Sequence, residues 1–169
     1  MSIQLWVEEM ESPVGRLMLV SNGRALCALE FEGCLERMQR LMETHLGPVE
    51  LKAAAGASDF RRRMEAYFAG EVTVLDKLAV ETGGTAFQRS VWSALRTIGA
   101  GTTLSYQQLA ARIGRPSAAR AVGMANSQNP VAIVQPCHRV IGANGKLTGY
   151  AAGLDRKRWL LAHEGVMLF

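Results

Sequence analysis

Residues 104–130, LSYQQLAARIGRPSAARAVGMANSQNP, limit the possible folds more than any other segment. They hold two short helical patterns around a glycine–proline break. Ser105 can cap a helix that runs through Ile113, because its hydroxyl accepts a hydrogen bond from a free N–H of the first helical turn. Gly114 permits a tight turn, and Pro116 suits the start of a second helix. Two helices joined by a short glycine turn form the helix-turn-helix pattern, which other antiparallel helix pairs share.

The predicted second helix, Ser117 to Asn126, has an unusual surface for a reader of bases. A helix in the major groove normally presents several long polar side chains, whereas here Arg120 is the one long cation among small residues: Ala118, Ala119, Ala121, Val122, Gly123 and Ala125. Small residues can approach the sugar–phosphate backbone closely, which favours a minor groove and little sequence choice. Arg120 could also fill the gap left by an extruded base. Alternatively, the alanines pack against another helix and Arg120 is a surface charge; the pattern alone favours neither interpretation.

The first half of the chain predicts strands followed by helices. Two apolar runs flank SNGR, a hairpin signal because Asn-Gly tolerates positive φ. Apolar residues recur at helical spacing from Leu35 to Leu46, and Ser58 can cap another helix in GASDFRRRMEAYFAGE. The segment VTVLDKLAV predicts a short strand or an extended link.

The best domain boundary is ETGGT, where two glycines precede Thr85, a candidate cap for the helix of AFQRSVWSALRTI. Residues 1–83 carry 9 Lys+Arg and 13 Asp+Glu, a net charge of −4. Residues 84–169 carry 10 Lys+Arg and 2 Asp+Glu, a net charge of +8, and the two add to the whole-chain +4. A basic second half suggests a polyanionic partner, with scattered solubilising charge as the alternative.

Composition predicts a soluble intracellular protein. The chain is 49% hydrophobic and 20% charged, without an apolar run long enough to span a membrane, and its N-terminus is acidic where a signal peptide would be basic. Cys27, Cys34 and Cys137 are an odd number, which argues against a disulfide framework. Cys27, Cys34 and His45 lack the spacing of a zinc set, so we expect no metal.

The stretch IVQPCHRVIG places Cys137 beside His138. A cysteine nucleophile needs a lowered pKa or an adjacent base, and His138 is the obvious base. Neighbours on a straight strand face opposite ways, so the backbone at Pro136 and Cys137 must turn if the two side chains cooperate. Glu164 could orient His138 as the third group of a relay. The alternative is a buried, inert Cys137.

Other cysteine chemistries explain less of the sequence. A zinc deaminase needs a second cysteine after PCHR and an upstream H-x-E, and both are absent. A cysteine protease or amidase gives no reason for a helix-turn-helix directly before the nucleophile. A transcription factor explains the helices and leaves PCHRV without a role. The preceding VAIV, residues 131–134, predicts a short buried strand.

The segment NPVAIVQPCHRVIGANGKLTGYAAGLDRKRWLLAHEG strongly resembles the O6-alkylguanine-DNA alkyltransferases, or methylated-DNA–protein-cysteine methyltransferases. The resemblance runs from TAFQRSVW to HEG and continues more weakly in SPVGRLMLV and YFAGE. It implies a ribonuclease-H-like α/β supporting domain over residues 1–83. It also implies a mainly α, winged-helix-like domain over residues 84–169, which binds DNA and accepts the alkyl group.

The family's activity is direct-reversal DNA repair. The resemblance implies that O6-alkylguanine, and also O4-alkylthymine, is flipped out of duplex DNA and loses its alkyl group irreversibly to Cys137, one event per molecule, without a cofactor. The implied partner is double-stranded DNA, bound in the minor groove with little sequence specificity. We expect a cytoplasmic, nucleoid-associated monomer with no membrane contact, and cooperative binding along DNA is left open.

The resemblance also implies residue roles. Cys137 looks like the alkyl acceptor, His138 would take its proton through a water, and Glu164 would orient His138. Asn129 resembles the hinge that joins the recognition helix to the active-site strand. Arg120 resembles the arginine that replaces the flipped nucleotide. The other expected DNA contacts are Ser117, Ala119, Ala121, Gly123 and Tyr106.

The implied base pocket is formed by Tyr106, Pro136, Val140, Tyr150, Ala151 and Lys157. Tyr106 resembles the tyrosine that rotates the backbone phosphate and donates a proton as the guanine leaves. The carbonyls of Cys137 and Val140 would accept from the exocyclic amine. The N–H of Ala151 would face O6, and Lys157 is similar to the family's pocket-wall lysine.

Some positions depart from the family pattern. Gln135 stands where relatives usually have an apolar residue, Ala86 replaces a common proline, and Ala151 and Ala152 stand where many relatives have Ser or Gly. The extra methyl group of Ala152 predicts a narrower pocket that disfavours bulky alkyl groups. The second hypothesis for the whole chain is a non-catalytic helix-turn-helix DNA-binding protein with a structural Cys137, although non-enzymatic relatives carry tryptophan in place of that cysteine.

Overall fold

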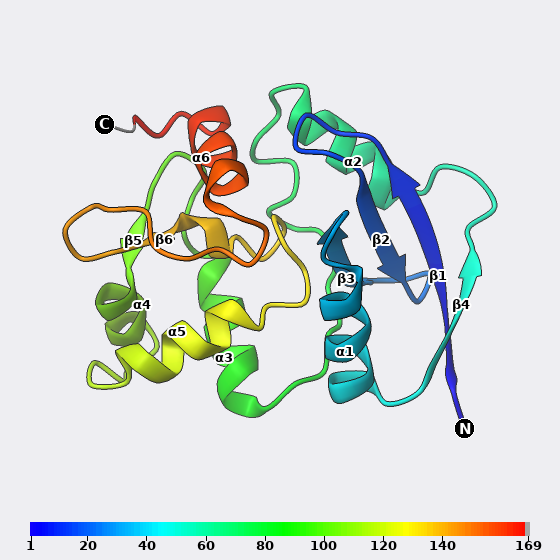
Figure 1. The fold of residues 1–169 in the computed structure, drawn as a ribbon, viewed down its shortest axis with the longest axis horizontal. Coiled ribbons are helices and arrows are strands. Elements are labelled where there is room, and N and C mark those ends of the chain that lie inside the picture. Colours follow the sequence, from blue (N-terminus) through cyan, green and yellow to red (C-terminus); the bar gives the residue numbers. More distant parts are fainter. Residues whose placement is uncertain (168–169) are drawn as a thin grey trace. The chain divides into compact units, whose positions relative to one another are not determined.

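The computed structural model describes residues 1–167, so the last two residues of the predicted second domain lie outside the described part. The chain divides into two compact units (Figure 1). The first is Met1–Gly84 with Pro130–Val134, and the second is Thr85–Asn129 with the chain from Gln135 onward. A small sheet with helices in the first unit and a mainly helical second unit confirm the predicted fold class. None of the described helices is long and apolar enough to cross a membrane.

The first unit is built on a four-stranded sheet in the order β3-β2-β1-β4. Its strands are β1 (Ile3–Met10), β2 (Leu17–Ser21), β3 (Leu26–Phe31) and β4 (Val49–Ala53). The predicted hairpin joins β2 to β3, and Asn22 Oδ1 accepts from the N–H groups of Arg24 and Ala25 in its turn. Strand β4 pairs parallel with β1. It escaped prediction because four of its five residues are exposed, so it has no apolar alternation.

Two helices complete the first unit, α1 (Leu35–Leu46) and α2 (Asp59–Phe68). Both were predicted, and the Ser58 hydroxyl caps α2 by accepting from the N–H of Arg61 at 3.1 Å. Cys27 lies in the core beneath α1, and burial raises the pKa of its thiol to about 11. Such a thiol stays protonated, in agreement with a structural role. In VTVLDKLAV, residues 72–77 form consecutive turns and Val80 makes an isolated parallel bridge with Leu26, so the segment is a link and not a strand.

The predicted strand at residues 131–134 is wrong, although the segment is buried as expected. Leu29 holds it through two backbone bonds, donating to the Pro130 carbonyl at 3.0 Å and accepting from the N–H of Ala132 at 3.1 Å. The chain then turns, because Ile133 has a φ of 69°. That region is unfavourable for a β-branched residue and costs roughly 1–3 kcal/mol. The apolar residues 131–134 therefore predicted burial correctly, but they did not predict that the backbone turns.

The second unit packs its helices around a core that includes Val91, Trp92, Leu95, Leu109 and Val122. Its elements are α3 (Ala86–Leu95), β5 (Leu104–Ser105), α4 (Tyr106–Arg112), α5 (Ala119–Ser127), the 3-10 turn η1 (Cys137–Arg139), β6 (Val140–Ile141) and α6 (Leu154–His163). Strands β5 and β6 pair in parallel beside the helix-turn-helix.

The predicted helix starts in the second unit are largely correct because their caps are local. Thr85 and Ser105 each form a capping box, with Gln88 and Gln108 reaching back to the N-cap N–H. Helix α5 begins at Ala119 instead of Ser117, because the N–H of Ala118 still closes a turn onto the Arg115 carbonyl at 2.9 Å.

Candidate active site around Cys137

The backbone turns at Cys137, as cooperation with His138 requires. Pro136 leads into η1, the N–H of Cys137 donates to the Gln135 carbonyl at 2.7 Å, and the N–H of Arg139 donates to the Pro136 carbonyl at 3.0 Å. A 3-10 turn rotates successive side chains by about 120°, so Cys137 and His138 do not point in opposite directions as on a strand. Both are buried, Cys137 at 7% exposure and His138 at 0%.

His138 and Glu164 form a fully buried pair, with His138 Nε2 2.9 Å from Glu164 Oε2. Burial lowers the pKa of His138 despite the opposing carboxylate, so the imidazole is neutral near pH 7. Nε2 then carries the proton that it donates to Glu164. Nδ1 is buried and bonds to no described residue, so its lone pair is the one that can accept a proton.

Arg139 fixes Glu164 from the other side, and sequence analysis missed it. Its Nε donates to Glu164 Oε1 at 2.8 Å, its Nη2 to Oε2 at 2.9 Å, and its Nη1 to the Ile98 carbonyl at 2.6 Å. Burial opposes ionisation of Glu164, but the charges and hydrogen bonds of His138 and Arg139 outweigh it and hold the pKa of that carboxyl well below its usual range. One sequence signal could have indicated this ion pair: Glu164 is one of only two acidic residues after Gly83, among ten Lys and Arg residues.

Asn129 and Gln135 bracket the segment that leads to Cys137. Asn129 Nδ2 donates to the Gln135 carbonyl at 2.7 Å, and Gln135 Nε2 donates to Asn129 Oδ1 at 2.8 Å. Both residues are at least 95% buried. The polar side chain that departs from the family pattern is therefore hydrogen-bonded to the predicted hinge residue, and this pairing was not expected.

Lys157 joins two backbone segments of the predicted base pocket, at Val140 and at Thr148. Its buried Nζ donates to the Val140 carbonyl at 2.7 Å and to the Thr148 carbonyl at 3.0 Å. Burial lowers the pKa of Lys157 to about 8, although the nearby Cys137 opposes this shift. Tyr106 is half-buried, and its hydroxyl accepts from Thr148 Oγ1 at 3.1 Å. Thr148 was not among the predicted site residues.

The remaining predicted pocket residues differ in exposure. Val140 and Pro136 are buried, Tyr150 is half-buried and Ala151 is exposed.

Within residues 1–167, no group of three or more His, Cys, Asp or Glu side chains is arranged to hold a metal ion.

The predicted DNA-contacting residues lie on and before α5. Arg120, Ser117 and Ala121 are exposed, whereas Ala119 and Gly123 are partly covered. A Cβ atom on Gly123 would lie 3.6 Å from Tyr106 Cδ1, so the glycine packs against that ring. Arg120 makes no ion pair or side-chain hydrogen bond with any other described residue, and its guanidinium is available to a partner.

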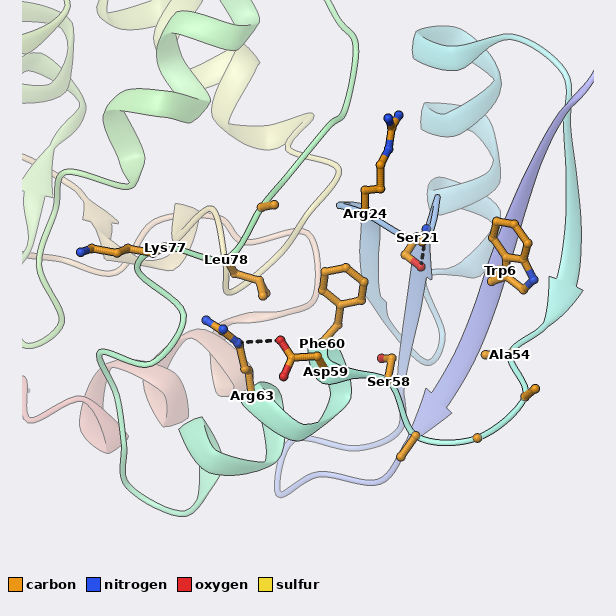
Figure 2. Close-up of a pocket in the computed structure, with 15 residues that line it drawn as sticks. Trp6, Ser21, Arg24, Ala54, Ser58, Asp59, Phe60, Arg63, Lys77 and Leu78 are labelled. Carbon is orange, nitrogen blue, oxygen red and sulfur yellow. Dashed lines mark hydrogen bonds and ion pairs between the residues drawn. The ribbon is translucent and has the colours of Figure 1, made fainter.

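A separate cavity of about 590 Å³ lies in the first unit, lined by residues that include Trp6, Ser58 and Phe60 (Figure 2). Arg63 pairs with Asp59 at 2.9 Å, and the charged ends of Arg24 and Lys77 point away from that pair.

Comparison with known proteins follows the same division of the chain. The ribonuclease-like domain of 6-O-methylguanine DNA methyltransferase matches residues 7–82, and the DNA-binding domain of the same family matches residues 86–166. The methylated-DNA–protein-cysteine methyltransferase of Salmonella typhimurium is 48% identical over 169 residues, 98% of this chain and 99% of the relative. This chain belongs to the methylated-DNA–protein-cysteine methyltransferase family. The resemblance predicted from the PCHRV segment is thereby confirmed.

Other members of the methyltransferase family are similar to this chain in sequence and in fold. The methylated-DNA–protein-cysteine methyltransferase of Mycobacterium tuberculosis is 49% identical over 154 residues, 91% of this chain and 88% of the relative. The crystal structure of Mycobacterium tuberculosis OGT in complex with DNA superposes with a TM-score of 0.80 at 42% identity, covering 96% of this chain and 92% of that one. The enzyme of Pyrococcus kodakaraensis shares the fold at 24% identity, with a TM-score of 0.75.

Proposed function

We propose that this protein repairs DNA by direct reversal: it flips O6-alkylguanine, and also O4-alkylthymine, out of duplex DNA and transfers the alkyl group irreversibly to Cys137. The observation that carries the proposal is a row of buried hydrogen-bonded side chains: Arg139 donates to Glu164, and Glu164 accepts from His138. His138 directly follows Cys137 in the sequence. Such a row supplies a neutral, oriented base next to a thiol in a family whose relatives are named for transfer to a protein cysteine.

The chemistry is a displacement at carbon. The Cys137 thiol gives its proton through a water to His138 Nδ1, and the thiolate attacks the alkyl carbon. The S–C bond forms while the C–O6 bond breaks, and its electron pair stays on guanine, which takes a proton from Tyr106. A dry pocket favours this step because water would otherwise screen the interactions that stabilise the departing base. The thioether product cannot be hydrolysed, so each molecule acts once.

The pocket roles follow the same scheme. The carbonyls of Cys137 and Val140 accept from the guanine exocyclic amine, and the Ala151 N–H faces O6. Lys157, Tyr150 and Pro136 form the walls. The two bonds of Lys157 to the Val140 and Thr148 carbonyls support such a role, because they hold the two sides of the pocket together. Asn129 acts as the hinge that supports the Cys137 segment.

The proposed partner is double-stranded DNA, contacted in the minor groove by α5 with little sequence choice. The unpaired guanidinium of Arg120 enters the stack where the damaged base leaves it, with Ser117, Ala119, Ala121, Gly123 and Tyr106 along the backbone. The net charge of +8 after Gly83 supports this assignment. Residues 84–169 are the DNA-binding and alkyl-acceptor domain, and residues 1–83 support it. We propose a cytoplasmic monomer, consistent with three free cysteines.

The test is mass spectrometry of the intact protein and its peptides after incubation with duplex DNA that carries one O6-methylguanine. We expect a Cys137 peptide heavier by one methylene, in proportion to the lesion lost. Cys137→Ser should abolish transfer and keep DNA binding. An unmodified wild-type protein that still binds the duplex would instead support the second hypothesis, a non-catalytic DNA-binding protein.

A further inference from the structure

Thr148 connects two parts of the proposed base pocket. It lies between β6 and α6, where its backbone carbonyl accepts from Lys157 Nζ at 3.0 Å. Its side-chain hydroxyl donates to Tyr106 Oη at 3.1 Å, across 42 residues of sequence. A Cβ atom on Gly142 would lie 3.2 Å from Thr148 Cγ2, so the methyl group lies close to the Gly142 backbone. Both the backbone carbonyl and the side-chain hydroxyl of the threonine are therefore hydrogen-bonded.

The hydrogen bond fixes the position of the Tyr106 hydroxyl relative to Thr148. A phenol has one proton to donate and two lone pairs that accept. When the Thr148 hydroxyl donates in the 3.1 Å bond, Tyr106 keeps its own O–H proton for another acceptor. Gly123 packs against the Tyr106 ring, so the ring is supported by α5 and the hydroxyl by Thr148.

We propose that Thr148 is a positioning residue for alkyl transfer, which orients the Tyr106 hydroxyl so that its proton points to the departing guanine. This inference rests on the proposed function. As the S–C bond forms and the C–O6 bond breaks, the Tyr106 proton moves to the guanine that holds the released electron pair. The tyrosinate then regains a proton through solvent from His138, which received it from Cys137, so protons and charge balance.

The experiment compares Thr148→Val, which keeps the shape and removes the hydroxyl, with Thr148→Ser, which keeps the hydroxyl. The single-turnover rate of methyl transfer is measured at saturating duplex DNA that carries O6-methylguanine. A positioned proton donor contributes roughly 10²–10⁴-fold to a rate. We expect Thr148→Val to lose about 10–100-fold, because Tyr106 remains but is no longer held. Thr148→Ser should stay within about threefold of wild type, and the exposed Thr73→Val is the matched control.

A double-mutant cycle separates positioning from general support of the fold. In a Tyr106→Phe background, which has no phenol proton, Thr148→Val should cause no further loss of rate. Melting temperature and affinity for undamaged DNA are measured in parallel, and Thr148→Ala provides the same comparison if valine impairs folding. A full additional loss in the Tyr106→Phe background, or a Thr148→Val rate equal to wild type, would overturn the inference. Failure of the wild-type protein to transfer methyl would instead overturn the proposed function.

Discussion

Replacement of Arg139 by methionine should be among the most destabilising single changes in the second unit. Arg139 is 5% exposed and donates three hydrogen bonds of 2.6–2.9 Å, two to Glu164 and one to the Ile98 carbonyl. Methionine preserves apolar packing but leaves Glu164 as a buried charge without its arginine partner. Removing one partner of a buried ion pair costs about 3–5 kcal/mol. A protein of this kind has about 5–15 kcal/mol of stability in total.

The assay is urea unfolding at pH 7, monitored by tryptophan fluorescence, because Trp92 is buried in the core of the second unit. Arg158→Met is the matched control, because Arg158 is exposed and lies 4.0 Å from the exposed Asp155. The control should lose less than about 0.5 kcal/mol. The double variant Arg139→Met/Glu164→Gln should be more stable than the sum of the two single losses predicts, since no charge is left unpaired.

The pH dependence of the stability lost in Arg139→Met is a second test of the ion pair. Arg139 helps to hold the pKa of Glu164 below its usual 4.5, so its contribution is fully present above that pH and is lost as the pH falls through the folded-state pKa. The deficit of Arg139→Met should therefore narrow below pH 4.5. An Arg139→Met loss no greater than that of Arg158→Met would refute the reasoning.

Three further outcomes are expected. Gln135→Leu removes the bond to Asn129 Oδ1 and should cost about 1–2 kcal/mol in urea unfolding, whereas a Gln135 that merely fills space would be replaced without loss. The melting temperature should fall as the pH drops below about 6.5. Burial lowers the pKa of His138, so the unfolded chain binds a proton that the folded protein excludes. A melting temperature that stays constant between pH 7.5 and 5 would contradict this. O6-Benzylguanine should react more slowly than the methyl lesion, and Ala152→Gly should narrow the gap; equal wild-type rates would argue against a pocket narrowed by Ala152.

The sequence alone determined the features that depend on neighbouring residues. The caps at Ser58, Thr85 and Ser105, and the Asn22-Gly23 hairpin, satisfy backbone groups within a few positions, so the pattern contains the whole interaction. The family could likewise be inferred from one contiguous segment around PCHRV. The roles of individual site residues stay predictions.

Interactions between residues that are distant in the sequence depend on the packing of the folded unit. Arg139 meets Glu164 across 25 residues, and Tyr106 meets Thr148 across 42. Residues 131–134 are buried like a strand, but Ile133 turns the chain, because burial is set by composition whereas direction depends on the available hydrogen-bond partners. Such partners are brought together by packing of the whole unit, and no local pattern records which polar group will lie within 3 Å of which.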